Sequence, residues 1–153
     1  MAKQHKSYAG LRYARKEIAS LVPPTMKFVE PFAGHAWVSR EVCDTKAKVC
    51  ILGDIQREPL EWVKKMHRIK NAKLIQQDWR ETIKECRDPN SICLIDPPWD
   101  KCYEAWKGNC DDFREEILKR VREIPNVIIT LNPSTENIAV SYTHLSLPTN
   151  QTV

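Results

Sequence analysis

Five short apolar segments, separated by segments with a helical pattern, constrain the fold of this chain more than any other feature. The apolar segments are continuous rather than alternating, which is typical of strands buried on both faces of a parallel sheet. We predict strands at residues 26–30, 48–52, 72–76, 91–95 and 126–131. We predict helices at residues 12–21, 35–43, 57–69, 79–87 and 111–124. This alternation predicts an α/β fold with a doubly wound, mostly parallel sheet.

The chain has 153 residues, which suits one domain with a real core. Residues 137–153 differ from the rest because they contain no Asp, Glu, Lys or Arg. We therefore expect a domain at residues 1–138 that lacks the last strands of its fold class, and an irregular or non-native tail at residues 139–153. The tail resembles translated sequencing-adapter read-through. The alternative is a genuine final hairpin, because residues 138–147 partly alternate.

No apolar run approaches the roughly 20 residues that a membrane-spanning helix needs, so we expect no membrane contact. Residues 1–7 are polar and basic, unlike a secretory signal. The six cysteines form no CxxC pair and show no metal-ligand spacing. We therefore expect free thiols, no bound metal and a reduced, cytoplasmic location.

Basic residues gather in two segments. Residues 1–29 hold six Lys and Arg against one acid, and residues 62–73 hold five with no acid. Such clusters can contact the phosphate backbone of a nucleic acid. The alternative is a solvated helix face.

Acidic residues follow four of the five predicted strands, where the sequence reads EPFAG, GDI, QDW, DPPW and NPS. In doubly wound sheets ligands bind beyond the carboxyl ends of the strands, so these segments should carry the function. The chain has only four glycines, and we expect each of them where a ligand must approach the backbone closely.

The strongest signal is Asp96-Pro97-Pro98-Trp99, directly after a hydrophobic strand. The two prolines fix the backbone, and the Asp96 carboxylate and Pro97 carbonyl can both accept hydrogen bonds from one amino group. The ring of Trp99 can stack on a planar base. The segment predicts a site for the exocyclic amine of a nucleobase, and the alternative is a rigid turn with a buried tryptophan.

The other segments fit a nucleoside. Gly34 lets the backbone approach a ligand, and only the first glycine of a dinucleotide fingerprint is present, which disfavours a pyrophosphate cofactor. Asp54, twenty residues later, suits ribose hydroxyls, although a surface turn would also explain it. Asp78 and Trp79 offer an acceptor and an aromatic face for a purine; the alternative is a helix N-cap followed by a packed tryptophan.

EPFAG, Asp54 and DPPW together resemble the S-adenosylmethionine-dependent amino-methyltransferases of nucleic acid, whose fold is the Rossmann-like class I fold. Residues 7–13, reading SYAGLRY, are similar to the segment that precedes the first strand in Dam-like DNA adenine methyltransferases. The resemblance covers residues 7–134. The chain departs from the family at Arg12, Ala36 and Trp37, where a lysine, a second glycine and a small residue are usual.

The resemblance implies transfer of a methyl group from S-adenosylmethionine to the 6-amino group of adenine, with DNA favoured over RNA as the partner. The alternatives are methylation of an adenine or guanine amino group in RNA, and an inactive remnant that binds nucleic acid. The cofactor would be held by Tyr8, Gly10, Arg12, Glu30, Pro31, Phe32, Gly34, Asp54, Ile55, Asp78 and Trp79. The target base would be held by Asp96, Pro97, Pro98 and Trp99.

Overall fold

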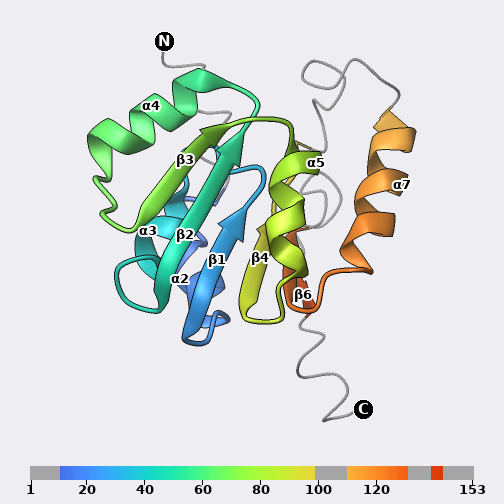
Figure 1. The fold of residues 1–153 in the computed structure, drawn as a ribbon, viewed down its shortest axis with the longest axis horizontal. Coiled ribbons are helices and arrows are strands. Elements are labelled where there is room, and N and C mark those ends of the chain that lie inside the picture. The colour runs from blue at the N-terminus through green and yellow to red at the C-terminus, as the bar shows by residue number, and fades with distance from the viewer. Residues whose placement is uncertain (1–10, 99–109, 131–138, 143–153) are drawn as a thin grey trace.

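A computed structural model describes residues 11–98, 110–130 and 139–142. Tyr8, Gly10 and Trp99 lie outside the described residues. Helices and strands alternate along the chain, as Figure 1 shows. They are α2 (Arg15–Ser20), β1 (Thr25–Glu30), α3 (Trp37–Val42), β2 (Ala47–Asp54), α4 (Arg57–Met66), β3 (Ala72–Gln76), α5 (Trp79–Thr82), the 3₁₀ helix η1 (Ile83–Arg87), β4 (Ser91–Ile95), α7 (Cys110–Val121), β5 (Val127–Thr130) and β6 (Ala139–Tyr142).

The strands form one sheet in the order β3-β2-β1-β4-β5-β6. Strands β1 to β5 are parallel, and β6 pairs antiparallel with β5. The predicted doubly wound, mostly parallel sheet is therefore confirmed, with five strands at the predicted places. Strand β6 lies in the uncharged tail, in the part for which a final hairpin was the alternative expectation.

The helices are shorter than predicted for local reasons. Helix α4 ends at Met66 because Arg68 takes a left-handed backbone conformation, with φ at 53°. The segment predicted as a helix at residues 79–87 divides into α5 and η1. Among the described residues, no helix has the length and apolar character that crossing a bilayer requires.

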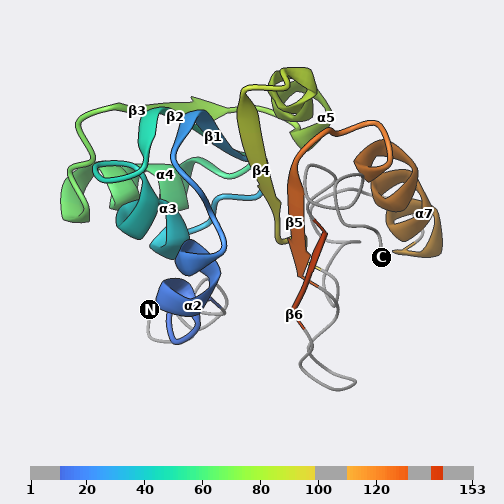
Figure 2. The same cartoon turned by 90° about the horizontal axis from the view of Figure 1, so that it is seen from below.

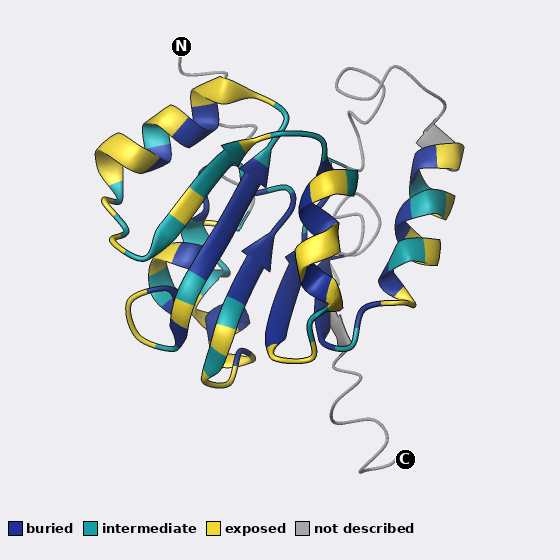
Figure 3. Cartoon of the chain, in the orientation of Figure 1, coloured by how far each residue is buried: buried dark blue, intermediate teal, exposed yellow. Residues whose placement is uncertain are grey.

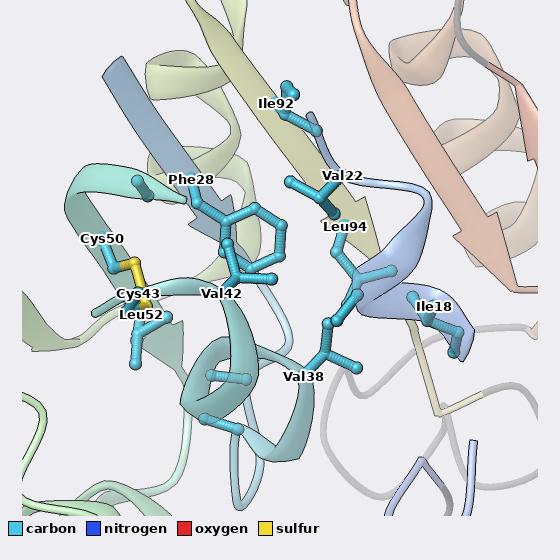
Figure 4. Close-up of a cluster of buried hydrophobic side chains, with 14 of the residues drawn as sticks. Ile18, Val22, Phe28, Val38, Val42, Cys43, Cys50, Leu52, Ile92 and Leu94 are labelled. Atoms are coloured by element: carbon cyan, nitrogen blue, oxygen red, sulfur yellow. A yellow bond between two sulfur atoms is a disulfide. The ribbon is translucent and has the colours of Figure 1, made fainter. Parts of the chain in front are cut away.

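Helices cover both faces of the sheet, as Figure 2 shows. Helices α2, α3 and α4 cover one face, called here the α4 face, and α5, η1 and α7 cover the other, called the α7 face. Strands β4 and β5 are buried along their whole length, and β1 and β2 are buried mainly toward their carboxyl ends (Figure 3). Figure 4 shows the core on the α4 face, where Phe28, Leu52 and Leu94 pack against Val38 and Val42.

One disulfide on each face of the sheet joins a strand to the helical segment that precedes it. Cys43 and Cys50 are linked on the α4 face, and Cys86 and Cys93 on the α7 face. Their Cα atoms lie 5.9 and 5.7 Å apart. The expectation of free thiols at these four positions is wrong, because each pair connects a helix to the strand that follows it. Since disulfides persist mainly in oxidising compartments, the cysteines do not support the predicted reduced location.

Candidate active site at the carboxyl edge of the sheet

The candidate site lies where the strand order reverses. The chain moves outward from β1 through β2 and β3 on one side, and through β4 and β5 on the other. In such a sheet a crevice opens beyond the carboxyl ends of the two central strands. Glu30 ends β1 and Asp96 directly follows β4, so the structure brings these two predicted site residues together, as the sequence predicts.

Glu30 is a buried acid, with 2% of its surface exposed. Its Oε1 accepts hydrogen bonds from the backbone N–H of Ser39, at 3.1 Å, and from the Ser39 hydroxyl. Burial raises the pKa of Glu30 to about 8; Asp96 also raises it, whereas the bonds from Ser39 lower it. Glu30 therefore caps the first turn of α3, a role that sequence reasoning missed.

Asp96 is half-buried and accepts a hydrogen bond at Oδ1 from the Thr130 hydroxyl. Burial raises the pKa of Asp96 to about 6, and the bond from Thr130 lowers it. Pro97 is buried and Pro98 half-buried. Sequence reasoning missed Thr130, although its place at the carboxyl end of a predicted strand could have indicated it.

The loop after β1 has a strained backbone. Gly34 and Ala36 both have a left-handed conformation, with φ at 52° and 51°. Ala36 stands where the family resemblance places a second glycine, so the position keeps the conformation that glycine adopts most easily. Pro31 and Ala36 are buried, whereas Phe32 and Gly34 are partly exposed.

Asp54 ties the loop after β1 to the end of β2. Its Oδ2 accepts a hydrogen bond from the Gly34 N–H at 2.9 Å, and its Oδ1 accepts one from the Gln56 N–H at 2.8 Å. Burial raises the pKa of Asp54, and the bonds from backbone N–H groups lower it. The twenty-residue spacing of the sequence therefore does bring Gly34 and Asp54 together, with half-buried Ile55 beside them.

Gly53 packs closely against a helix. A Cβ at this position would meet the side chain of buried Thr82, at the end of α5. Packing of helix against strand therefore excludes a side chain at position 53. The expected approach of a ligand to this glycine stays a prediction.

Asp78 and Trp79 are held by the protein itself. Asp78 caps α5 through a 2.8 Å bond from the Arg80 N–H, and it pairs with the Arg80 guanidinium. Trp79 is fully buried and packs against Phe32 at 5.7 Å and Phe113 at 6.2 Å between ring centroids. Both side chains thus have the structural roles that the sequence left open as alternatives, and the partly exposed ring of Phe32 covers Trp79.

The guanidinium of Arg12 lies 5.0 Å from the centre of the Trp37 ring. This contact joins two of the positions where the chain departs from the family pattern. Within the described ranges, His, Cys, Asp and Glu side chains form no group of three or more that could hold a metal ion.

Comparison with known proteins identifies a shared fold. No family model and no curated protein matches the chain. Similar solved structures include an rRNA methylase from Streptococcus thermophilus, with 14% identity, a TM-score of 0.53, and coverage of 77% of this chain and 68% of that one. A protein from Streptococcus mutans assigned as a SAM-dependent methyltransferase has 17% identity, a TM-score of 0.61, and coverage of 82% and 35%.

A third similar structure is a protein from Streptococcus mutans assigned as a methyltransferase and solved in complex with SAH. It has 13% identity, a TM-score of 0.52, and coverage of 80% of this chain and 72% of that one. At these identities the likeness concerns the fold, which is the Rossmann-like fold of methyltransferases.

Proposed function

We propose that this chain is a methyltransferase that uses S-adenosylmethionine to methylate the exocyclic 6-amino group of adenine in DNA. The observation that carries the proposal is the position of Asp96, followed by two prolines, at the carboxyl end of β4 next to the end of β1, within electrostatic reach of Glu30. The similar structures that are named as methyltransferases, one of them solved with SAH, support the cofactor.

The charge of the crevice suits this cofactor. Asp54 and Asp96 lie at the carboxyl edge of the sheet, and neither pairs with a Lys or Arg among the described residues. Glu30, whose pKa is raised to about 8, is largely uncharged at neutral pH. The cofactor carries a positive sulfonium and an ammonium group, which carboxylates attract. Gly34 and Asp54 would hold its nucleoside, where the left-handed backbone at Gly34 allows close approach.

The target amine needs activation because its lone pair is delocalised into the ring. Thr130 holds Oδ1 of Asp96, so Oδ2 is the oxygen that can accept a hydrogen bond from the amine. The Pro97 carbonyl would accept the second hydrogen, and together the two acceptors localise the lone pair on nitrogen. S-adenosylmethionine, when bound, supplies the electrophilic methyl group. A raised pKa makes Asp96 a better acceptor than an ordinary aspartate for the proton that the amine releases.

The test is transfer of labelled methyl groups to duplex DNA, followed by digestion and identification of the modified base. We expect N6-methyladenine with the wild-type chain. Asp96→Ala should abolish transfer while leaving the dissociation constant for SAH unchanged. Asp44→Ala, which alters an exposed aspartate, should leave both unchanged. Wild-type turnover in Asp96→Ala would refute the role of Asp96.

A second variant tests the cofactor site. Asp54→Ala should weaken SAH binding by about 1–3 kcal/mol, the range for a lost hydrogen bond to a charged group. An unchanged dissociation constant would remove Asp54 from the site.

An RNA base is the second candidate substrate, because one of the similar structures is an rRNA methylase. The same assay with a structured RNA separates the two candidates by the identity of the labelled nucleoside. Binding of nucleic acid without any transfer would instead favour the inactive remnant.

A further inference from the structure

Charge is distributed unequally between the two faces of the sheet. The helical and connecting segments of the α4 face, at residues 11–24, 36–46 and 56–71, hold ten Lys and Arg against five Asp and Glu. Those of the α7 face, at residues 77–90 and 110–125, hold seven against nine. The α4 face is therefore the basic side of the molecule.

Ion pairs occur on both faces, with Arg80–Glu116 and Lys84–Glu81 on the α7 face and Arg57–Glu61 and Arg15–Glu41 on the α4 face. The α4 face differs in having a group of four cations that lie close together in the sequence. Within the described residues, Lys64, Lys65, Arg68 and Lys70 take part in no ion pair, and all four are exposed. We call these four residues the α4 basic patch.

Helix stability explains only part of this patch. Lys64 and Lys65 lie in the last turn of α4, where cations interact favourably with the helix dipole. Arg68 and Lys70 lie beyond the end of α4, so the helix dipole does not explain their presence. Lys73 follows on β3, but strand alternation places it on the opposite face from Ala72 and Leu74.

The patch borders a hollow of about 370 Å³ between α4 and β3. Its apolar lining comes from Val63, Ile69, Ala72 and Leu74, and its cationic lining from Lys64 and Arg68. An elongated anion could lie in this hollow and interact there with cations that form no ion pair in the part of the chain that the structure describes.

The patch is fixed to the candidate active site through α4. His67, the residue after α4, lies with Nε2 2.8 Å from the backbone oxygen of His35 in the loop after β1. Trp62 of α4 stacks on the His35 ring, with centroids 3.9 Å apart. The same loop carries Gly34, which bonds to Asp54. These contacts connect the end of α4, which carries the α4 basic patch, to the loop that holds Gly34.

We propose that the α4 basic patch docks the phosphate backbone of the duplex DNA substrate. This inference rests on the proposed function, which makes DNA the substrate. The charge of the patch complements phosphates, and contacts to phosphates position a duplex without reading its sequence. The hollow between Lys64 and Arg68 takes the sugar-phosphate strand, while the target base lies in the crevice.

The experiment measures binding of a fluorescein-labelled DNA duplex over a range of salt concentrations. The patch variant combines Lys64→Gln, Lys65→Gln and Arg68→Gln. The matched control combines Lys84→Gln, Lys119→Gln and Arg122→Gln, which removes the same charge from exposed positions of the α7 face. Circular dichroism and SAH binding verify that both variants are folded.

We expect the patch variant alone to lose affinity. The slope of log K against log salt should fall by about 2.7, because each lost phosphate contact removes about 0.9. An equal loss in the control, or an unchanged slope in the patch variant, would overturn the proposal. A loss confined to an RNA stem–loop of the same sequence, or tighter binding of poly-glutamate than of DNA, would also overturn it.

Failure of the docking proposal can be distinguished from failure of the proposed methyltransferase function. Normal DNA binding by the patch variant, with N6-methyladenine formed by the wild type, rejects the patch and keeps the methyltransferase. Lost DNA binding by the patch variant, with no methyl transfer by the wild type, keeps the patch and rejects the methyltransferase.

Discussion

The two faces of the sheet share an architecture but differ in what their side chains do. Each face has a helix-covered apolar core, and each has a disulfide that joins a helical segment to the next strand. On the α7 face, Arg80 forms a bidentate pair with Glu116 at 2.7 Å. On the α4 face, cations at the end of α4 are left to solvent. The clearest difference between the faces is therefore the balance of charge, with ten Lys and Arg against five acids in the segments of the α4 face and seven against nine in those of the α7 face.

The largest predicted effect compares the two disulfides, which have the same sequence separation of seven residues. Removing either pair, as Cys43→Ala with Cys50→Ala or as Cys86→Ala with Cys93→Ala, should reduce the free energy of unfolding by about 2–3 kcal/mol, from the entropy of closing a short loop. All four cysteines are buried, so each variant also loses two buried sulfur atoms and leaves a cavity in the core. Urea unfolding of both variants measures the two losses.

Reducing agent supplies the control, because a reductant should lower the stability of each variant only through its remaining disulfide. Equal losses would mean that chain entropy governs both links. A difference above about 1 kcal/mol would show that packing of the two faces matters more than loop length.

The next effect compares two glutamates whose pKa values move in opposite directions. Glu30 binds a proton more tightly in the folded chain, so the free energy of unfolding should fall as pH rises from 4.5 to about 8. The Arg80 hydrogen bond lowers the pKa of Glu116, so its contribution is present above 4.5 and is lost as pH falls through the lowered value. Glu30→Gln should stabilise the chain at pH 8, whereas Glu116→Gln should destabilise it at pH 7 by about 1 kcal/mol or less, since the pair is partly exposed.

Thermal unfolding between pH 3 and pH 9 measures both changes. Glutamine can still accept the Ser39 bonds, which isolates the charge of Glu30 from its capping role. A Glu30→Gln profile parallel to that of the wild type would contradict the raised pKa. A Glu116→Gln loss that persists at pH 3 would show that the contact with Arg80 acts by packing.

The smallest effect concerns backbone strain, which among the described residues other than glycine is confined to Ala36 and Arg68, on the α4 side. Ala36→Gly relieves the left-handed alanine but adds freedom to the unfolded chain, and we expect a net gain of about 0.5 kcal/mol. Ala33→Gly, at a buried alanine nearby, should instead destabilise the chain by about 0.5–1 kcal/mol. Equilibrium unfolding distinguishes the two signs, and a loss at Ala36 as large as that at Ala33 would count against strain.

Local patterns accounted for much of the fold. Continuous apolar runs predicted the five parallel strands, and the rule that ligands bind beyond carboxyl ends predicted that Glu30 would lie near Asp96. The partners of these acids could not be predicted, because Ser39 and Thr130 reach them across different elements. The spacing of residues along the sequence did not indicate these two partners.

Other residues illustrate the same limit. A seven-residue cysteine spacing forms a disulfide only when a helix end and the next strand bring the two sulfurs together. The need for glycine at position 53 comes from Thr82, which lies on the other side of two intervening elements. Such features depend on the packing of two elements that are distant in the sequence. The residue pattern of a single segment does not reveal which elements will pack together.

Each disulfide lies on one side of the junction between β1 and β4. Cys43–Cys50 lies within the part built on β1 and β2, and Cys86–Cys93 within the part built on β4, so neither link crosses the junction of β1 and β4. That junction is matched over three residue pairs, against five between β1 and β2. Glu30 and Asp96 stand on opposite sides of it. Strand pairing, together with the bond from Thr25 to Asn90 and the ion pair of Lys27 with Glu85, therefore holds the two sides together where neither disulfide does.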